Sequence, residues 1–143
     1  MQFSSRLPIA VHILLCIEHF QGQYKTTSEF LAGSVNVNPV IIRRTLGQLK
    51  KAGLVEVEAG VGGAQLARKP EEITLRDVFC AVEGGEDALF RFHEHPNPEC
   101  PVGRNVHTLL DARLDGARAA MERSLEQVTL RELLEELDGN LEI

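Results

Sequence analysis

A short basic segment interrupts an otherwise acidic chain. Between positions 37 and 54 the charged residues are Arg43, Arg44, Lys50 and Lys51, whereas the chain of 143 residues carries a formal net charge of −6. Residues 25–69 hold seven basic and three acidic side chains, and the rest of the chain holds eight and eighteen. Guanidinium and ammonium groups gathered on one segment of an acidic protein indicate a face that contacts a polyanion. A solvated helix face is the alternative explanation of the charge alone.

Thiol and imidazole groups form a second set of reactive side chains, at His93, His95, Cys100 and His107. All four are ligands that zinc and similar ions accept, but their spacing matches no zinc motif, and histidines in loops are usually solvated. A metal site is therefore the weaker interpretation. Cys100 stands immediately before Pro101, at the predicted start of a long helix, where the positive end of the helix dipole favours the thiolate. This position predicts a thiol that responds to oxidation.

The cysteines argue against a disulfide framework, because their number is odd, their spacing is irregular and no CxxC pair occurs. Cys16 and Cys80 lie among apolar helix residues, which predicts inert core thiols. Since no second cysteine lies near Cys100, its oxidised form would be a sulfenic acid, a mixed disulfide or a bond between two subunits.

Two predicted helices precede the basic segment. Apolar residues at helical spacing predict the first from Ser5 to about Phe20, with Pro8 in its first turn. A short helix follows, with Thr27 or Ser28 as its N-cap.

The basic helix is predicted to begin at Asn38-Pro39 and to end near Ala52, with Gly53 just beyond it. At about 100° per residue, one arc of this helix is suited to packing and the opposite arc is basic. The packing arc comprises Ile42, Thr45, Leu46, Leu49 and Ala52, and the basic arc comprises Pro39, Val40, Arg43, Arg44, Gly47, Lys50 and Lys51. A close approach to the basic arc is possible at its central glycine.

A β-hairpin is predicted directly after the basic helix. Val55, Val57 and Ala59 alternate with two glutamates, as in a half-buried strand, and residues 64–67 can form the returning strand. The GVGG sequence at positions 60–63 is a turn that requires positive φ.

The remainder of the chain is predicted to be helical apart from one loop. Residues 73–83 form a helix with Thr74 and Asp77 as a capping box, and residues 86–101 are rich in proline and turn formers. A helix from Pro101 to about Val128 would be about 39 Å long, longer than this small domain can cover. It carries an apolar stripe of Val106, Leu110, Leu114, Ala117, Met121, Leu125 and Val128. The stripe predicts a second copy of the same helix, with packing inside one chain as the alternative. A short acidic helix ends the sequence.

The order of these elements is typical of a winged helix-turn-helix. In such a unit the second helix of the motif enters the major groove of double-stranded DNA, while Lys and Arg contact phosphates. The predicted fold is mainly α, with residues 1–84 as the DNA-binding domain, 85–100 as a sensor-like loop and 101–143 as a dimerisation helix and a short helix. A winged-helix module that binds protein is the alternative, and a steep loss of affinity with salt would distinguish the DNA-binding protein from it.

The segment from Leu31 to Gly84 resembles the Rrf2 family of bacterial transcription regulators. The blocks LKKAGLVE, GxGGxxLAR and ITLxDVxxAVEG are the most specific, and the likeness extends to SSRLPIAVHILL and to the long helix. The resemblance implies a dimer whose long helices cross between subunits and whose winged domains bind a pseudo-palindromic site. Carried over by position, it implies a groove-reading turn at Pro39, Val40, Arg43 and Arg44, backbone anchors at Thr27, Ser28, Lys50 and Lys51, and a wing tip at Gly60, Gly62 and Gly63.

Two departures from the family pattern alter these expectations. Many members have an arginine just before the first wing glycine, and Ala59 in its place predicts a smaller contribution of the wing and less A·T preference. Several members hold an iron–sulfur cluster with three cysteines in the loop before the long helix, but this loop contains Cys100 alone. No cluster is therefore expected, and a metal- or cluster-dependent sensor is the alternative to a thiol switch of the kind suggested for some cluster-free relatives.

Other functional classes find little support. The sequence contains no P-loop, no GxGxxG after a strand and no nucleophile elbow, so an enzyme is not expected. The N-terminal apolar segment is interrupted by His12, Glu18 and His19, and no run approaches the ~20 apolar residues that span a bilayer. These features predict a cytoplasmic protein without a membrane partner. The predicted function is a homodimeric DNA-binding transcription regulator, a repressor, that responds to oxidation through Cys100.

Overall fold

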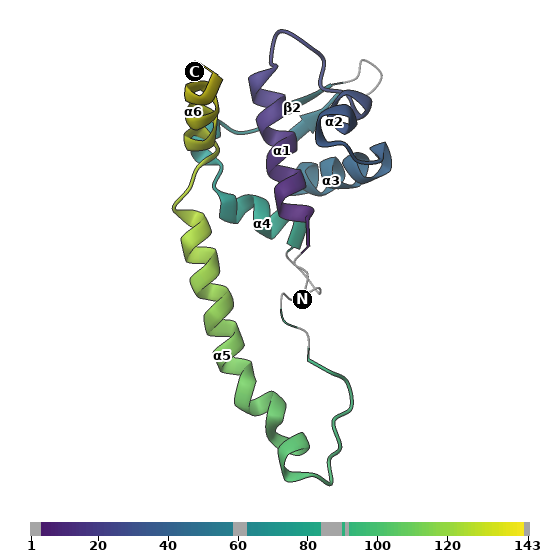
Figure 1. Cartoon of the computed structure of the whole chain (residues 1–143), viewed down its shortest axis with the longest axis vertical. Coiled ribbons are helices and arrows are strands. Elements are labelled where there is room, and N and C mark those ends of the chain that lie inside the picture. The colour runs from purple at the N-terminus through teal and green to yellow at the C-terminus, as the bar shows by residue number, and fades with distance from the viewer. Residues whose placement is uncertain (1–3, 59–62, 84–89, 91, 142–143) are drawn as a thin grey trace.

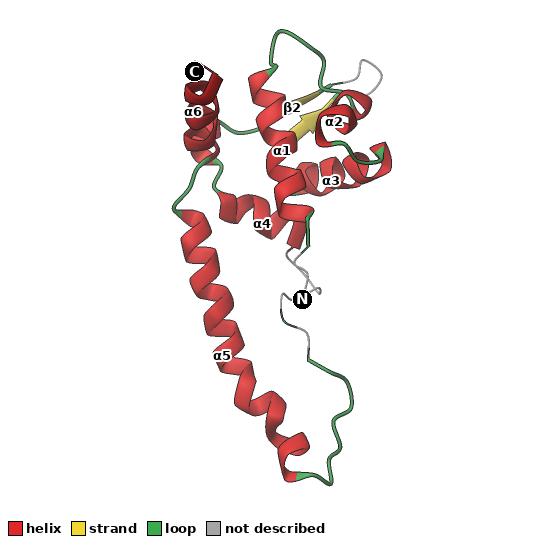
Figure 2. Cartoon of the chain, in the orientation of Figure 1, coloured by secondary structure: helices red, strands yellow, loops and turns green. Residues whose placement is uncertain are grey.

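The computed structural model describes residues 4–58, 63–83, 90 and 92–141. Within these ranges the elements follow in the order α1 (Arg6–His19), α2 (Ser28–Val35), α3 (Pro39–Lys51), β1 (Val55–Val57), β2 (Ala64–Leu66), η1 (Pro70–Glu72), α4 (Leu75–Glu83), α5 (Pro101–Glu126) and α6 (Leu130–Leu141). Helices α2, α3, α4 and α6 and the hairpin gather around α1, and α5 extends away from them (Figure 1). Helices dominate the chain (Figure 2), which confirms the predicted mainly α class.

An aliphatic core joins α1 to the helices around it. Helix α1 contacts α2, α3, α4 and α6, and α3 also contacts α4. The largest fully buried side chains are Ile13, Leu14, Leu31, Ile42, Leu49, Leu54, Ile73, Leu130, Val55 and Val78. Four of the five residues of the predicted packing arc of α3 are buried against this core, and the last helix adds to it.

Side-chain caps fix the beginnings of α2 and α3. The hydroxyl oxygen of Thr27 accepts a hydrogen bond from the Phe30 backbone N–H at 3.1 Å, which makes Thr27 the N-cap of α2. The Asn38 amide oxygen accepts from the Val40 N–H at 2.9 Å, and Pro39 occupies the first helical position, where its missing N–H costs no hydrogen bond.

The end of α3 is a Schellman motif around Gly53. The N–H groups of Gly53 and Leu54 donate to the carbonyls of Lys50 and Leu49, each at 3.0 Å. Gly53 has a φ of 78°, which only glycine adopts without strain. The chain thus reverses at the predicted glycine and leads directly into β1.

The hairpin is held against the helix-turn-helix by Thr26. Strands β1 and β2 pair antiparallel, with Val55 opposite Leu66 and Val57 opposite Ala64. Thr26 is buried, its hydroxyl donates to the Ala64 carbonyl at 2.9 Å, and its backbone carbonyl accepts from the Ala64 N–H at 3.2 Å. Val55 is buried, as the alternation predicts, but Val57 is exposed, so the predicted burial was wrong there because β1 ends at that residue; Ala59 lies outside the described residues.

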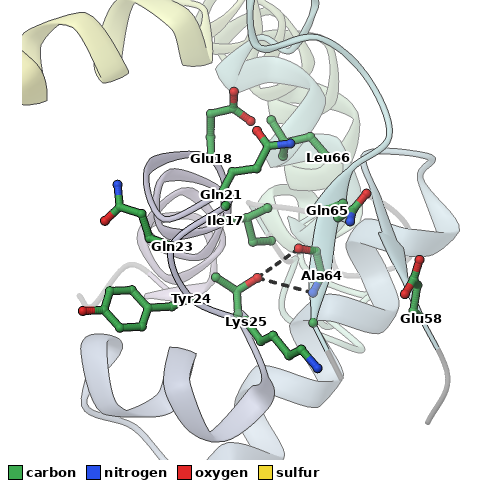
Figure 3. A pocket seen from close by; sticks show the side chains of 13 residues that line it. Ile17, Glu18, Gln21, Gln23, Tyr24, Lys25, Glu58, Ala64, Gln65 and Leu66 are labelled. Atoms are coloured by element: carbon green, nitrogen blue, oxygen red, sulfur yellow. Dashed lines mark hydrogen bonds between the residues drawn. The ribbon is translucent and has the colours of Figure 1, made fainter. Parts of the chain in front are cut away.

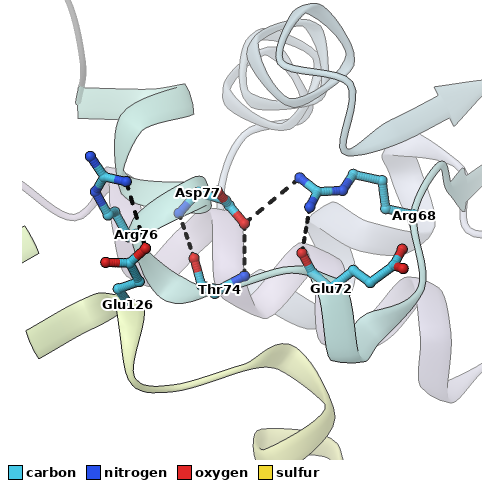
Figure 4. A network of polar contacts seen from close by, with 6 residues as sticks. All are labelled: Arg68, Glu72, Thr74, Arg76, Asp77 and Glu126. Carbon is cyan, nitrogen blue, oxygen red and sulfur yellow. Dashed lines mark hydrogen bonds and ion pairs between the residues drawn. The ribbon is translucent and has the colours of Figure 1, made fainter. Parts of the chain in front are cut away.

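A polar network connects the hairpin to α4 (Figure 4). The predicted capping box is present, because the Asp77 N–H donates to the Thr74 hydroxyl at 3.1 Å and the Thr74 N–H donates to the Asp77 carboxylate at 3.0 Å. Arg68, just after β2, lies 3.7 Å from the same carboxylate and donates to the carbonyl of Glu72 at 2.6 Å. Glu72 belongs to η1, a short helix that the sequence pattern did not predict.

Helix α6 returns to the winged domain. The Leu75 N–H donates to the Val128 carbonyl at 2.9 Å, and the Leu130 N–H donates to the Ile73 carbonyl at 2.8 Å. Leu130 and Leu134 of α6 are both buried in the common core. Helix α6 is thus packed into the same core as α1–α4.

Helix α5 has no buried residue along its length. Its C-terminal part contacts α4, where the Arg118 guanidinium lies 5.8 Å from the centre of the Phe79 ring. Its N-terminal part extends beyond the other helices (Figure 1). Val102 and Leu109 are 69% and 57% exposed on this extended part. Among the described residues, no helix is both long and apolar enough to cross a membrane.

Candidate nucleic-acid interface

Helix α3 presents the predicted basic face to solvent. Ile42, Thr45, Leu46 and Leu49 are buried against the core, and Ala52 of the predicted packing arc is exposed. All the predicted contact residues of the opposite arc are exposed except Pro39, which is half buried. These side chains face solvent in the described part of the chain, which suits contact with a polyanion.

Arg43 differs from the other basic residues of α3 because it has an acidic partner. Its guanidinium lies 3.0 Å from the carboxylate of Glu29 on α2, and both side chains are more than half exposed. The sequence analysis did not connect these two residues, which lie fourteen positions apart. No acidic residue lies among the predicted contact residues of α3 itself, where Arg44, Lys50 and Lys51 complete the basic face.

Thr27 and Ser28 lie at the start of α2, and both are half buried. The Thr27 oxygen accepts the cap hydrogen bond described above, which leaves its hydroxyl proton free to donate to a phosphate oxygen. Lys25 and Thr26 precede this N-cap, so a short polar segment leads into α2.

The wing is described in part. Gly63 has a φ of 125°, so the predicted need for glycine at this turn position is confirmed. Gly60 and Gly62, the other predicted wing contacts, lie outside the described residues, as does Ala59.

A cavity of about 350 Å³ lies between the end of α1 and the wing (Figure 3). Ile17 and Ala64 contribute apolar lining, and Glu18, Lys25 and Glu58 contribute charges. The buried Thr26, which is hydrogen-bonded to Ala64 of β2, also lines this cavity. Sequence reasoning missed Thr26, since a single threonine in a polar turn carries no burial signal.

Cys100 is the N-cap residue of α5 and is half buried. The backbone N–H groups of Gly103, and then of Val102, stabilise the thiolate and lower the pKa of the Cys100 thiol below its usual range. The preceding turn packs closely on the helix, since a Cβ added at Gly103 would lie 2.6 Å from the carbonyl oxygen of Asn97. The local geometry therefore agrees with the predicted thiolate character.

The other two cysteines differ from each other. Cys16 is buried, as predicted, and its thiol donates to the Ser34 hydroxyl at 3.3 Å. Cys80 is exposed, so its assignment to the core was wrong, because α4 turns this residue toward α5 instead. Burial of part of its surface, and then the Glu122 carboxylate, raise the pKa of the Cys80 thiol. Glu122 lies about 33 Å along α5 from Cys100, so a disulfide between Cys80 and Cys100 of one chain is excluded.

The weak metal candidates are not gathered around one point in the described part of the chain. The Nε2 of His107 donates to the His93 carbonyl at 3.1 Å, and the His107 ring stacks on Phe92 with centroids 4.4 Å apart. The His95 side chain is 94% exposed. Within residues 4–58, 63–83, 90 and 92–141, no three His, Cys, Asp or Glu side chains are placed to hold a metal ion. The donor set around Cys100 does not fit an iron–sulfur cluster, which requires several thiolates.

Helices α1–α3 followed at once by a hairpin, with a basic exposed face on α3, define a winged helix-turn-helix DNA-binding protein. The family model for Rrf2, described as an iron-dependent transcriptional regulator, matches residues 3–136. The chain belongs to the Rrf2 family and is therefore a DNA-binding transcription regulator and not an enzyme.

Two relatives illustrate this membership. YwnA of Bacillus subtilis (strain 168), named as an HTH-type transcriptional regulator, is 42% identical over 134 residues, which cover 94% of this chain and 98% of YwnA. The HTH-type transcriptional regulator NsrR of Geobacillus kaustophilus (strain HTA426) is 27% identical over 142 residues, which cover 95% of this chain and 91% of NsrR.

Solved structures share the fold. A crystal structure described as that of a DNA-binding protein is 36% identical, has a TM-score of 0.72, and covers 91% of this chain and 99% of its own. CymR, the global cysteine regulator of B. subtilis, is 22% identical with a TM-score of 0.63 over 94% of this chain and 97% of its own. The second likeness shows the fold alone.

Proposed function

We propose that the protein is a dimeric repressor that binds a pseudo-palindromic operator with α3 of each copy in the major groove. The observation that carries this proposal is the uncovered basic face of α3, with its N-terminal turn fixed by Asn38 and Pro39. An ordered first turn can present side chains to base edges, and the lysines and arginines beyond it reach phosphates. Repression requires no activity beyond occupation of the operator.

The proposed dimer rests on α5. A helix of 26 residues with no buried residue and with Val102, Leu109 and Leu110 exposed is poorly covered in a single chain. Packing against a second copy would cover this surface, as an amphipathic helix requires. Two winged domains related by a two-fold axis would then bind half-sites about one helical turn, or a multiple of it, apart.

The experiment that tests DNA binding is a fluorescence-anisotropy titration of the purified protein with duplexes from the region upstream of its own gene. We expect specific binding whose logarithmic affinity falls linearly with the logarithm of salt concentration, because bound phosphates release counterions. Binding to no duplex, or affinity that is independent of salt, would contradict the proposal and favour a protein-binding winged helix.

A redox response through Cys100 is the regulatory part of the proposal, supported by the lowered pKa of its thiol at the start of α5. The test is the same titration with reduced protein, peroxide-treated protein and Cys100→Ser protein. Oxidation should change the affinity of the wild type and leave Cys100→Ser unchanged. Equal behaviour of the two proteins would remove the thiol from the mechanism and leave DNA binding intact.

A further inference from the structure

The exposed face of α3 has a central row without charge. At about 100° and 1.5 Å per residue, Val40 and Gly47 lie about 20° apart around the axis and about 10.5 Å apart along it. The midpoint of the four buried residues lies on the opposite side of the helix. Val40 and Gly47 therefore mark the line of α3 that projects furthest from the protein.

The basic residues flank this central row on both sides. On the helical wheel, Arg43 and Lys50 lie on one side of it and Arg44 and Lys51 lie on the other. A helix that enters the major groove meets bases along its central line and sugar-phosphate strands along its two flanks. The two basic flanks of α3 therefore match the two strands, and the uncharged row faces the bases.

The central row offers no hydrogen-bonding side chain. Val40 is 54% exposed, and its backbone N–H is occupied by the Asn38 side chain. The base-edge group that an apolar side chain contacts in the major groove is the C5-methyl of thymine. Arg43, which would otherwise be suited to guanine, lies on the flank and is already paired with Glu29.

Neither space nor backbone conformation requires a glycine at position 47 in the free protein. A Cβ added there would meet nothing within 4 Å, and the residue does not require a positive φ. Glycine in a helix interior is unfavourable relative to alanine, so its presence here calls for a reason outside the chain. Close approach of α3 to the groove floor supplies that reason.

We propose that α3 recognises thymine through the row Val40–Gly47. Val40 packs against the C5-methyl group of a thymine in each half-site, and Gly47 allows the helix to lie close to the groove floor. Arg43 with Lys50 and Arg44 with Lys51 hold the phosphates of the two strands. The inference rests on the proposed binding of DNA by α3, and it assigns sequence recognition to an apolar contact.

The test replaces thymine with uracil, which lacks only the methyl group. A high-affinity duplex is selected from a random library with the full-length protein, and each thymine is then replaced in turn. Loss of one buried methyl contact should weaken binding about fourfold, from about 0.8 kcal/mol per methyl group and 1.4 kcal/mol per tenfold change. Val40→Ala should bind the thymine duplex more weakly and should no longer distinguish thymine from uracil at that position, whereas the control Gln48→Ala should still distinguish them.

Gly47→Ala provides a second variant whose folding is secure. Its thermal midpoint should equal or exceed that of the wild type, while its affinity for the selected duplex should fall at least fivefold. Specific, salt-dependent binding without any uracil-sensitive position, or full affinity in Gly47→Ala, would overturn the proposed recognition and leave DNA binding by α3 standing. Failure to select any duplex would instead count against the proposed function itself.

Discussion

The Arg43 guanidinium and the Glu29 carboxylate, 3.0 Å apart, join the DNA-facing helix α3 to the helix before it. Both side chains are exposed, so the pair adds about 0–1 kcal/mol to stability and is screened by salt. We expect its larger effect on DNA binding, since Arg43 must give up or share its contact with Glu29 before its full charge can act on the phosphate assigned to it. A carboxylate beside the interface also repels DNA.

Replacement of Glu29 should therefore strengthen DNA binding. We expect Glu29→Gln to raise affinity roughly threefold at low salt, because the change removes a repulsive charge and releases Arg43. Glu71→Gln is the matched control, since it makes the same change in charge at an exposed pair with Arg131, on η1 and away from α3. Anisotropy titrations of both variants check the prediction. If both variants gain affinity equally, the gain comes from the change in net charge and not from the release of Arg43.

The basic residues of α3 that flank the row Val40–Gly47 should determine how DNA affinity depends on salt. Arg44→Ala and Lys51→Ala should each weaken binding and lower the slope of log affinity against log salt by about 0.9, the value for one lost phosphate contact. Arg131→Ala on α6 removes the same charge as Arg44→Ala and should leave the slope unchanged. An unaltered slope in both α3 variants would show that this helix does not contact the phosphates.

Thr26 should contribute more to stability than its small size suggests. Thr26→Val removes the hydroxyl that bonds Ala64 and leaves a buried carbonyl with fewer partners, which should lower the free energy of unfolding by roughly 1–2 kcal/mol. Thr108→Val, on the exposed surface of α5, should stay within about 0.5 kcal/mol of the wild type. Urea denaturation curves compare the three proteins, and similar midpoints for all would deny Thr26 this role.

The cysteines should differ in how their alkylation depends on pH. The lowered pKa of the Cys100 thiol keeps more thiolate near neutral pH, whereas the raised pKa of Cys80 keeps that thiol protonated. As the pH falls, modification of Cys80 by iodoacetamide should cease first and that of Cys100 last. Peptide mass spectrometry after timed reactions would follow both sites, and faster labelling of Cys80 at neutral pH would contradict the predicted order.

A charged residue on the apolar stripe of α5 should dissociate the proposed dimer into monomers. Leu110→Asp would place a charge in the interface and should shift the sedimentation of the purified protein from dimer to monomer. Thr108→Asp adds the same charge on the opposite side of the helix and should remain dimeric. A monomeric wild type, or a dimer in both variants, would require a different arrangement.

Much of the local structure could be predicted because its signals are local. Asn38-Pro39, Gly53 and the Thr74–Asp77 pair act through their own backbone neighbourhoods, and each is found in its predicted role. The two faces of α3 follow from periodicity alone, since a helix whose one side packs must expose the other.

The features that escaped prediction depend on contacts between distant positions. Glu29 meets Arg43 because α2 and α3 cross, and Thr26 meets Ala64 because the hairpin folds back on the turn before α2. The exposure of Cys80 depends on the direction of α4 relative to α5, which apolar neighbours in the sequence do not reveal. Contacts of this kind can be identified only once the tertiary arrangement of the helices is known.

The burial of Leu130 and Leu134 beside the α1 core has a consequence for synthesis on the ribosome. A chain emerges from its N-terminus at about 5–20 residues per second, so α1–α4 appear well before α6. The apolar surface that α6 covers stays open until the whole of α5 has been made. Completion of the DNA-binding unit therefore coincides with the appearance of the proposed dimerisation helix, and a truncated chain would lack both.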